Sequence, residues 1–221
     1  YSSVLPDQSF LTGVNSAYNY IDLGGTDEYI ALGNASDMNF TTGAFSVSAW
    51  VKVSNNAATM GVINKTLRWQ TYVHANGTFR MALYDGTYNP EVTGSTVIDD
   101  GNWHHLVAVR HIVDDKLYVY VDGSLDGNLT DTTGDISSSD TIEIGRRSTG
   151  DYFIGQIAQS SVYSKALSAS EISAIYTLGR HANLLDKYSD NLVGYWAMSA
   201  LDGSTGLSDV GNGTIYDRSG Q

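Results

Sequence analysis

Apolar and polar side chains alternate along much of this chain. The clearest stretch runs from Phe45 to Val53, where five apolar residues fall at every second position. Side chains two residues apart lie on the same face of a β-strand, so this spacing predicts a strand with one buried face. Similar short stretches recur as far as Tyr163, and Asn76-Gly77 between two of them is typical of a tight hairpin turn. The pattern therefore predicts many short strands.

A hairpin between Gly101 and Gly123 is largely apolar on both of its faces. We expect a strand through Trp103 and Val109, a polar turn at 114–116 and a second strand closed by Asp122-Gly123. Two apolar faces are typical of a strand in the middle of a sandwich. On the first strand, one face carries Leu106, Ala108 and Arg110, and the other carries Trp103, His105, Val107 and Val109.

One helix is predicted after these strands. Ser168 and Glu171 have the spacing of a capping box, in which the serine caps the helix and the glutamate reaches back to it. Apolar residues follow at helical spacing, and Gly179 is a natural end. We expect this helix to lie against one flank of the sandwich with an apolar face made by Ile172, Ile175, Tyr176 and Leu178.

The composition agrees with strands joined by many loops. Only four of the 24 acidic residues are Glu, and the chain has 23 Gly and 15 Tyr. Asp, Gly, Asn, Ser and Thr favour turns, whereas Glu and Lys, which favour helices, are scarce. A chain of 221 residues that is 42% hydrophobic is long enough for one large sandwich with its own core.

The net charge of −12 limits the partners of the protein. A surface this acidic repels phosphate groups, so we exclude nucleic acids and anionic membranes as partners, whereas divalent cations and neutral glycans are compatible with it. The sequence contains no Cys and no apolar run of membrane-spanning length, and we expect no signal peptide at its start. Because Tyr1 stands where Met is usual, we expect processing or excision from a longer chain.

Five segments, in order, resemble the laminin G-like members of the concanavalin A-like family. This resemblance covers roughly residues 20–178 and implies an all-β fold, a jelly roll of two antiparallel sheets with one short flanking helix. It divides the chain into a wrapping segment (1–19), a jelly roll (20–180) and a C-terminal extension (181–221). The segments are Leu23–Ile30, Phe45–Lys52, the hairpin at 101–123, Ile142–Gly145 and Phe153–Ser168.

Two departures from this resemblance concern carboxylates. Gly24 and Ala158 stand where many relatives have Asp that supports a rim calcium or its loops. In the C-terminal extension, Leu192–Trp196 and Thr214–Gly220 resemble a segment that normally precedes such a core. This extension either completes its own sandwich as an edge strand, begins a second domain, or pairs with a neighbouring chain.

The sequence offers no clear catalytic pair. Glycoside hydrolysis requires two carboxylates that flank the scissile bond, and none of the four Glu has an acidic partner at the spacing usual on this fold. His104 and His105 are adjacent on a predicted strand, so they point to opposite faces and cannot bind one ion together. We therefore expect no enzymatic activity.

Two binding sites are predicted instead. Asp27 and Asp151 are candidate calcium ligands, because calcium prefers oxygen ligands and the fold implied by the resemblance brings both residues to one rim. A glycan site needs an aromatic face and polar groups that bind hydroxyls. Candidates for it are Trp69 and the loop residues Tyr84, Asp85, Tyr88 and Asn89, whereas Trp50, Trp103 and Trp196 are expected in the core.

Three functions remain open. The first is a non-catalytic recognition module, extracellular or on a cell or virion surface, that binds glycans or a surface protein through rim loops. The second is a structural subunit that decorates a larger particle, such as a phage capsid or fibre, and joins neighbouring subunits through the C-terminal extension. The third is a glycoside hydrolase. Fold alone cannot choose among them.

Overall fold

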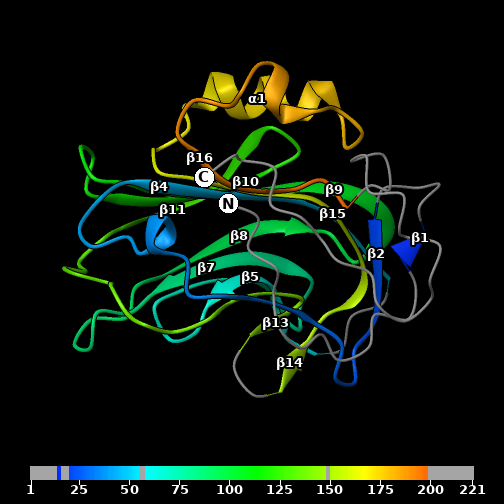
Figure 1. Ribbon diagram of the computed structural model, residues 1–221, viewed down its shortest axis with the longest axis horizontal. Helices are drawn as coiled ribbons and strands as arrows, with labels where there is room; N and C mark the ends of the chain where they lie inside the picture. Colours follow the sequence, from blue (N-terminus) through cyan, green and yellow to red (C-terminus); the bar gives the residue numbers. More distant parts are fainter. Residues whose placement is uncertain (1–13, 16–19, 55–57, 148–149, 199–221) are drawn as a thin grey trace.

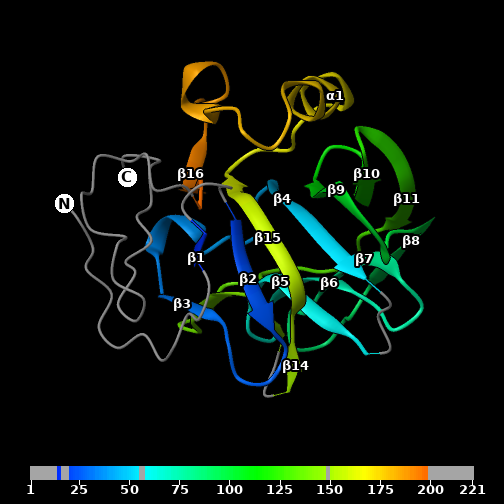
Figure 2. The same ribbon diagram turned by 90° about the vertical axis from the view of Figure 1, so that its right-hand side faces the viewer.

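The computed structural model describes residues 14–15, 20–54, 58–147 and 150–198. Within these residues the chain forms two large antiparallel sheets that pack face to face, and α1 (Ala169–Leu178) covers the outer face of one of them (Figure 1). Figure 2 shows the same layers end-on, with α1 above the strands of the first sheet and the second sheet below them. The jelly-roll sandwich predicted from the sequence is confirmed.

The first sheet has eight strands. In spatial order they are β1 (Val14–Asn15), β2 (Tyr20–Gly24), β15 (Ile154–Tyr163), β4 (Phe45–Ser54), β9 (Asp100–His111), β10 (Lys116–Val121) and β11 (Ser124–Thr130), with β16 (Leu192–Trp196) also beside β15. The predicted hairpin is β9 and β10. β9 lies between β4 and β10, so it is an interior strand, as its two apolar faces predicted.

The second sheet has six strands, and a short hairpin lies beside it. The six are β3 (Ile30–Gly33), β12 (Ile142–Ile144), β5 (Met60–Lys65), β6 (Trp69–Val73), β7 (Thr78–Leu83) and β8 (Glu91–Val97). The hairpin is β13 (Arg146–Arg147) with β14 (Asp151–Tyr152), and two 3-10 helices, η1 (Ser36–Met38) and η2 (Leu184–Asp186), complete the described residues.

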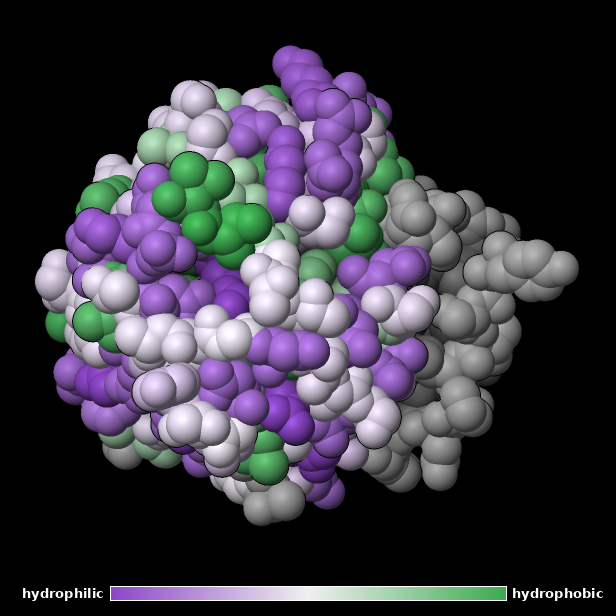
Figure 3. Space-filling view, turned by 90° about the vertical axis from the view of Figure 1, so that its left-hand side faces the viewer, coloured by the Kyte–Doolittle hydropathy of each residue, from purple (hydrophilic) through white to green (hydrophobic). Residues whose placement is uncertain are grey.

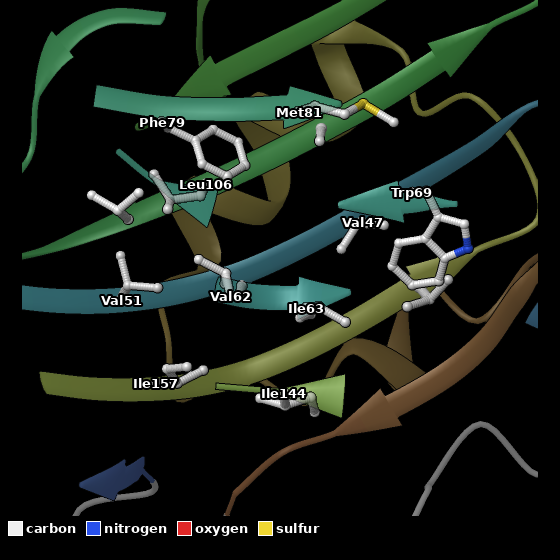
Figure 4. Packing of buried hydrophobic residues seen from close by; sticks show 14 of the residues in the cluster. Val47, Val51, Val62, Ile63, Trp69, Phe79, Met81, Leu106, Ile144 and Ile157 are labelled. Carbon is white, nitrogen blue, oxygen red and sulfur yellow. The ribbon is translucent and has the colours of Figure 1, made fainter. Parts of the chain in front are cut away.

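The main core fills the space between the two sheets. Figure 4 shows side chains of the first sheet, including Val47, Val51 and Leu106, facing side chains of the second. The alternation in the sequence predicted this arrangement, because every second residue of β4 from Phe45 to Val53 belongs to this core. Burial of such a large apolar surface is the main favourable term in folding.

A second, smaller core lies between the first sheet and α1. The capping box is present as predicted, with Ser168 as N-cap, and α1 buries Ile172 and Ile175. Tyr176 and Leu178, which were predicted on the same apolar face, are more than a third exposed. The helix is therefore anchored by two buried residues, and Tyr176 adds a ring stacked on Trp50 at 5.7 Å between centroids.

The C-terminal extension completes the first sheet over the part of it that is described. β16 pairs with the second half of β15, whereas β2 pairs with the first half, so the two strands lie in one row along the same edge of β15. Trp196 is buried in the main core, as predicted, but Trp103 is only half-buried. The similar segment Thr214–Gly220 lies outside the described residues.

One edge of the sandwich is closed by an aspartate that joins the two sheets. Asp126 on β11 accepts hydrogen bonds from the backbone N–H groups and the hydroxyls of Ser95 and Thr96 on β8. Gly127 lies so close to β8 that a Cβ atom would be 2.4 Å from the carbonyl oxygen of Thr93. Edge strands otherwise expose free backbone groups, and here the two edges protect each other.

Burial under α1 determines the protonation of His105. This side chain is fully buried, its Nε2 lies 2.8 Å from Ser48 Oγ, and its pKa is lowered from 6.5 to about 4 by desolvation. The imidazole is thus neutral in the folded protein, while in the unfolded chain it binds a proton below about pH 6.5. The stability contributed by the buried neutral imidazole is therefore fully present above about pH 6.5 and is lost as the pH falls toward 4.

We predict that this histidine accounts for part of the loss of stability in acid. Relative to His105→Gln, which does not titrate, the wild-type protein should lose on the order of 3 kcal/mol of unfolding free energy between pH 6.5 and pH 4. The measurement is urea unfolding of both proteins across this range. His104, whose pKa is raised mainly by its hydrogen bond to Asp122, is common to both and cancels. Parallel curves would contradict the assignment.

Candidate functional site

The two sites predicted from the sequence lie at opposite ends of the sandwich. Residues 84–89 connect β7 to β8 at one end, near the start of β4. Asp27 lies between β2 and β3 and Asp151 opens β14, both at the other end. Figure 3 shows the end with the 84–89 loop, where hydrophilic residues surround small separate groups of hydrophobic ones.

Asp85 fixes the shape of the 84–89 loop. Its Oδ1 accepts hydrogen bonds from the backbone N–H groups of Thr87 and Tyr88, each at 2.8 Å. An aspartate that bonds to the backbone two residues ahead forms a local turn of its own. The hydroxyl of Tyr84 donates to the carbonyl oxygen of Gly86 at 3.1 Å. The loop therefore holds a defined conformation before any ligand binds.

The same aspartate joins the loop to a neighbouring segment. Its Oδ2 accepts a hydrogen bond from Gly134 N–H at 2.8 Å. Hydrogen bonds from Gly134, Tyr88 and Thr87, in that order, lower the pKa of the Asp85 carboxyl, so it is ionised at neutral pH. Three backbone donors bind this carboxylate, so Asp85 positions the loop, and its predicted contact with a sugar hydroxyl stays a prediction.

Gly134 is in turn held by a buried arginine. Arg110 ends the apolar part of β9, and its guanidinium donates to Asp131 at 2.7 Å and to the backbone carbonyl oxygens of Thr41, Thr133 and Gly134 at 2.9 to 3.0 Å. These bonds fix the segment 131–134, which leads from one sheet to the other. A chain of contacts thus runs from the core through 131–134 to the exposed loop.

This arrangement leaves two aromatic rings accessible. Tyr84 is 38% exposed and Tyr88 is 54% exposed, and Asn89 beside them is exposed as well. Tyrosines offer a large, rigid contact area with little loss of side-chain freedom on binding, together with a hydroxyl for hydrogen bonds. The two rings with Asn89 are the predicted glycan-binding residues that the structure brings together at the surface.

The prediction for Trp69 is wrong. This side chain is fully buried in the main core (Figure 4). Its ring centroid lies 5.7 Å from that of Phe45 and 6.3 Å from that of Phe40. It has no face free for a sugar. Alternation along β6 correctly places the Trp69 side chain on one face of the strand. That face packs against the opposite sheet.

The outer face of the six-stranded sheet carries polar residues whose proximity the sequence did not predict. Register pairs place Glu143, Asn64, Gln70, Ala82 and Glu91 in one row across β12, β5, β6, β7 and β8. The β13–β14 hairpin covers this face over the start of β5, where it passes over Gly61 and a Cβ atom would be 2.2 Å from the Arg146 backbone.

The two glutamates in this row do not form a hydrolytic pair. Neighbouring strands are about 4.8 Å apart, and β8 is the fourth strand along the sheet from β12. Glu143 and Glu91 are therefore roughly 19 Å apart. Glycosidases need their two carboxyl groups within about 5 to 9.5 Å of each other. Each glutamate also has a partner of its own, Arg146 for Glu143 and Arg80 with Tyr72 for Glu91.

Asp27 and Asp151 belong to the same rim, next to a pair of arginines. Asp151 accepts a hydrogen bond from Arg147 Nε at 2.9 Å, and the guanidinium of Arg146 lies 3.7 Å from the ring centre of Tyr29. The described part of the chain contains no group of three or more His, Asp or Glu side chains arranged for a metal. A calcium ion would have to displace Arg147 from Asp151, and calcium binding stays a prediction.

Thermal unfolding with added calcium and with a chelator tests that prediction. If these two aspartates bind calcium, the ion should raise the melting temperature of the wild-type protein, because a ligand that binds only the folded state stabilises it. The rise should disappear in Asp27→Asn and in Asp151→Asn. Asp114→Asn, an aspartate in the β9–β10 turn at the opposite end, serves as the control. Equal melting temperatures with and without calcium would rule the site out.

Comparisons with known proteins agree with this fold. Residues 24–173 match the family model described as the concanavalin A-like lectin/glucanases superfamily. Among the described residues no helix is long and apolar enough to cross a membrane. No curated protein matches the chain in a sequence comparison.

Three solved structures illustrate the structural similarity. A candidate carbohydrate-binding protein from Bacteroides ovatus has a TM-score of 0.67 and 17% identity, covering 91% of this chain and 56% of its own. The binding domain of Paraclostridial Mosquitocidal Protein 1 has a TM-score of 0.62 and 16% identity, and the match covers 74% of this chain and 44% of that chain. The ligand-binding domain of Botulinum neurotoxin serotype D, in complex with N-acetylneuraminic acid, has a TM-score of 0.61 and 18% identity. The match covers 73% of this chain and 42% of that chain. This chain thus spans about half of those chains or less.

The role given to Asp85 predicts a specific change in loop dynamics. In Asp85→Ala the backbone N–H groups of Thr87, Tyr88 and Gly134 lose their acceptor and should exchange with solvent faster. Hydrogen exchange of peptides covering 84–89 and 131–136 measures this, with Asp37→Ala, an exposed aspartate of η1, as the control. Unchanged exchange in both peptides would show that the carboxylate does not hold the loop.

Proposed function

The chain belongs to the concanavalin A-like lectin/glucanase superfamily, and from that premise we propose that it is a non-catalytic recognition module. Its ligand is a neutral glycan, bound at the 84–89 loop. The observation that carries this proposal is the pair of exposed rings, Tyr84 and Tyr88, on a loop that Asp85 holds in one conformation. A binding surface that is ordered in advance loses less entropy on binding.

The charge of the protein favours a neutral ligand. At a net charge of −12 the protein repels anions at long range, and the proposed site has acidic residues around it, among them Asp85 and Asp135. The similar structures include a domain in complex with N-acetylneuraminic acid, which is an acidic sugar. That complex supports a carbohydrate as the class of ligand, while the charge of this chain favours a sugar without a carboxylate.

Two alternatives have less support. A glycoside hydrolase needs a close pair of carboxyl groups, and the two glutamates on the outer face of the six-stranded sheet are too far apart for one. A decoration subunit that joins neighbours through its C-terminal extension needs a free strand there, and the one strand of the extension within the described residues, β16, pairs with β15 of the same chain. We expect the module to act outside the cell, on a cell or virion surface, where it meets glycans or glycosylated proteins.

Substitution of Tyr88 tests the proposed site. We expect the wild-type protein to bind neutral oligosaccharides on a glycan array, and Tyr88→Ala to weaken binding to the best of them by roughly tenfold, the loss of one aromatic contact. Isothermal titration calorimetry measures the dissociation constants. Leu125→Ala, an exposed apolar residue on β11, is the control and should bind like the wild type.

Two results would contradict the proposal. One is an array that stays blank for folded wild-type protein, both with and without calcium. The other is release of reducing sugar from an oligosaccharide by the wild-type protein, which would identify an enzyme. Retained binding in Tyr88→Ala would leave a glycan-binding module but move its site away from the 84–89 loop.

A further inference from the structure

A neighbouring turn has an unusual residue at its tip. The hydrogen bond from Arg68 N–H to Lys65 C=O, 2.9 Å long, closes a four-residue turn between β5 and β6. Leu67 takes the third position of this turn with a φ of +57°. Gly or Asn is usual there, because a side chain with a Cβ in the left-handed region costs roughly 1 kcal/mol or more.

Folding alone does not account for Leu67. Its side chain is 58% exposed, so it buries little apolar surface that could offset the backbone strain. Residues held in strained backbone conformations without compensating contacts tend to cluster at binding sites. Leu67 also lies at the same end of the sandwich as the 84–89 loop, because β6 and β7 are adjacent antiparallel strands.

Arg68, the next residue, lies beside the 84–89 loop in the backbone register. Trp69 pairs with Leu83 in the register of β6 and β7, and the backbone N–H of Tyr84 donates to Arg68 C=O at 2.8 Å. Arg68 and Tyr84 are therefore opposite residues at the end of this strand pair. Both residues stand just outside the strands, next to Trp69 and Leu83, at the end of the sandwich that carries the 84–89 loop.

The guanidinium of Arg68 has unused hydrogen-bonding capacity. Its Nε is buried and has no hydrogen-bond partner among the residues that the structure describes. Asp140 is 3.9 Å from it, which is an ion-pair distance but too long for a hydrogen bond. Both side chains are partly exposed, at 28% and 42%. Arg68 offers donors and Asp140 offers acceptors, and neither group is saturated by the other.

We propose, on the basis of the glycan-binding function above, that Leu67, Arg68 and Asp140 complete the site begun by Tyr84 and Tyr88. Arg68 and Asp140 together bind two adjacent hydroxyls of a neutral hexose, one group donating and the other accepting. Leu67 packs against the C–H side of the sugar. The ligand class is thus a neutral oligosaccharide with a free pair of vicinal hydroxyls.

The ligand is neutral because the arginine is already balanced by acids. Asp140 is its ion-pair partner, and Asp135 is close enough that the charge of Arg68 contributes to lowering its pKa, after the larger effect of the Ser137 backbone N–H. A sugar carboxylate at Arg68 would meet this negative charge. Hydroxyls can bind between the two side chains without that repulsion.

Leu67→Asn separates binding from stability. Asn adopts positive φ readily, so the variant should unfold at the same temperature as the wild type or higher. It should nevertheless bind neutral hexose oligosaccharides on the array roughly fivefold to tenfold more weakly, because the apolar contact is lost. Val113→Asn, which changes an even more exposed apolar residue at the tip of the β9–β10 hairpin, should alter neither property.

Arg68→Lys tests the hydroxyl pair. Lysine keeps the charge but lacks the planar set of donors, so we expect at least about tenfold weaker binding to the same oligosaccharides. Asp140→Asn should have a similar effect, since it replaces one acceptor with a donor. The second probe is the same set of oligosaccharides carrying one N-acetylneuraminic acid, which should bind the wild type more weakly than the neutral set.

The outcomes distinguish this inference from the proposed function. If Tyr88→Ala weakens binding while Leu67→Asn and Arg68→Lys bind like the wild type, the inference is wrong and the glycan-binding function stands. A wild-type preference for the sialylated set that Arg68→Lys removes would also overturn it, because Arg68 would then bind a carboxylate. A wild-type protein that binds neither set would overturn both.

Discussion

The candidate site depends on one buried charge, the guanidinium of Arg110. A charged group in the interior is costly unless it is fully paired and hydrogen-bonded. Arg110 meets this condition by collecting Asp131 and three backbone carbonyl oxygens from segments far from it in sequence. Because these bonds are obligatory, the segment 131–134 has little freedom, and Gly134 presents its N–H to Asp85 in a fixed place.

The loops at this end therefore have a rigid base and an exposed tip. Asp85 gains a donor from the 131–134 segment and holds Tyr88, while the adjacent β5–β6 turn presents Leu67 at a local cost in backbone energy. The opposite end is arranged differently. There the arginines of β13 are paired with Asp151 and Glu143 and lie over the rings of Tyr72 and Tyr29, so that its cations and aromatic rings are already engaged.

Much of the fold could be predicted from the sequence because local patterns carry it. The alternation from Phe45 to Val53, the interior hairpin at 101–123 and the capping box at Ser168 each depend on residues close together in the chain, and each is found as predicted. The two adjacent histidines of that hairpin point to opposite faces and serve the structure. His105 lies under α1, and His104 bonds to Asp100 and Asp122.

The site was less predictable because long-range contacts make it. The 84–89 loop could be identified from the tyrosines and polar residues of its sequence, but the role of Asp85 depends on Gly134, 49 residues away. Trp69 was misplaced because alternation gives two faces without saying which one meets a second sheet. Tyr72, on the other face of β6, is buried too, since Gly61 lets the β13–β14 hairpin bring Arg147 over it.

The most direct test is an NMR titration of the ¹⁵N-labelled protein with a neutral oligosaccharide that it binds on the array. The predicted result is a set of amide shift changes confined to residues 66–68, 84–89, 134–135 and 140, all at one end of the sandwich. Changes centred instead on residues 25–29 and 150–153 at the opposite end, or on the outer face of α1, would contradict the placement of the site.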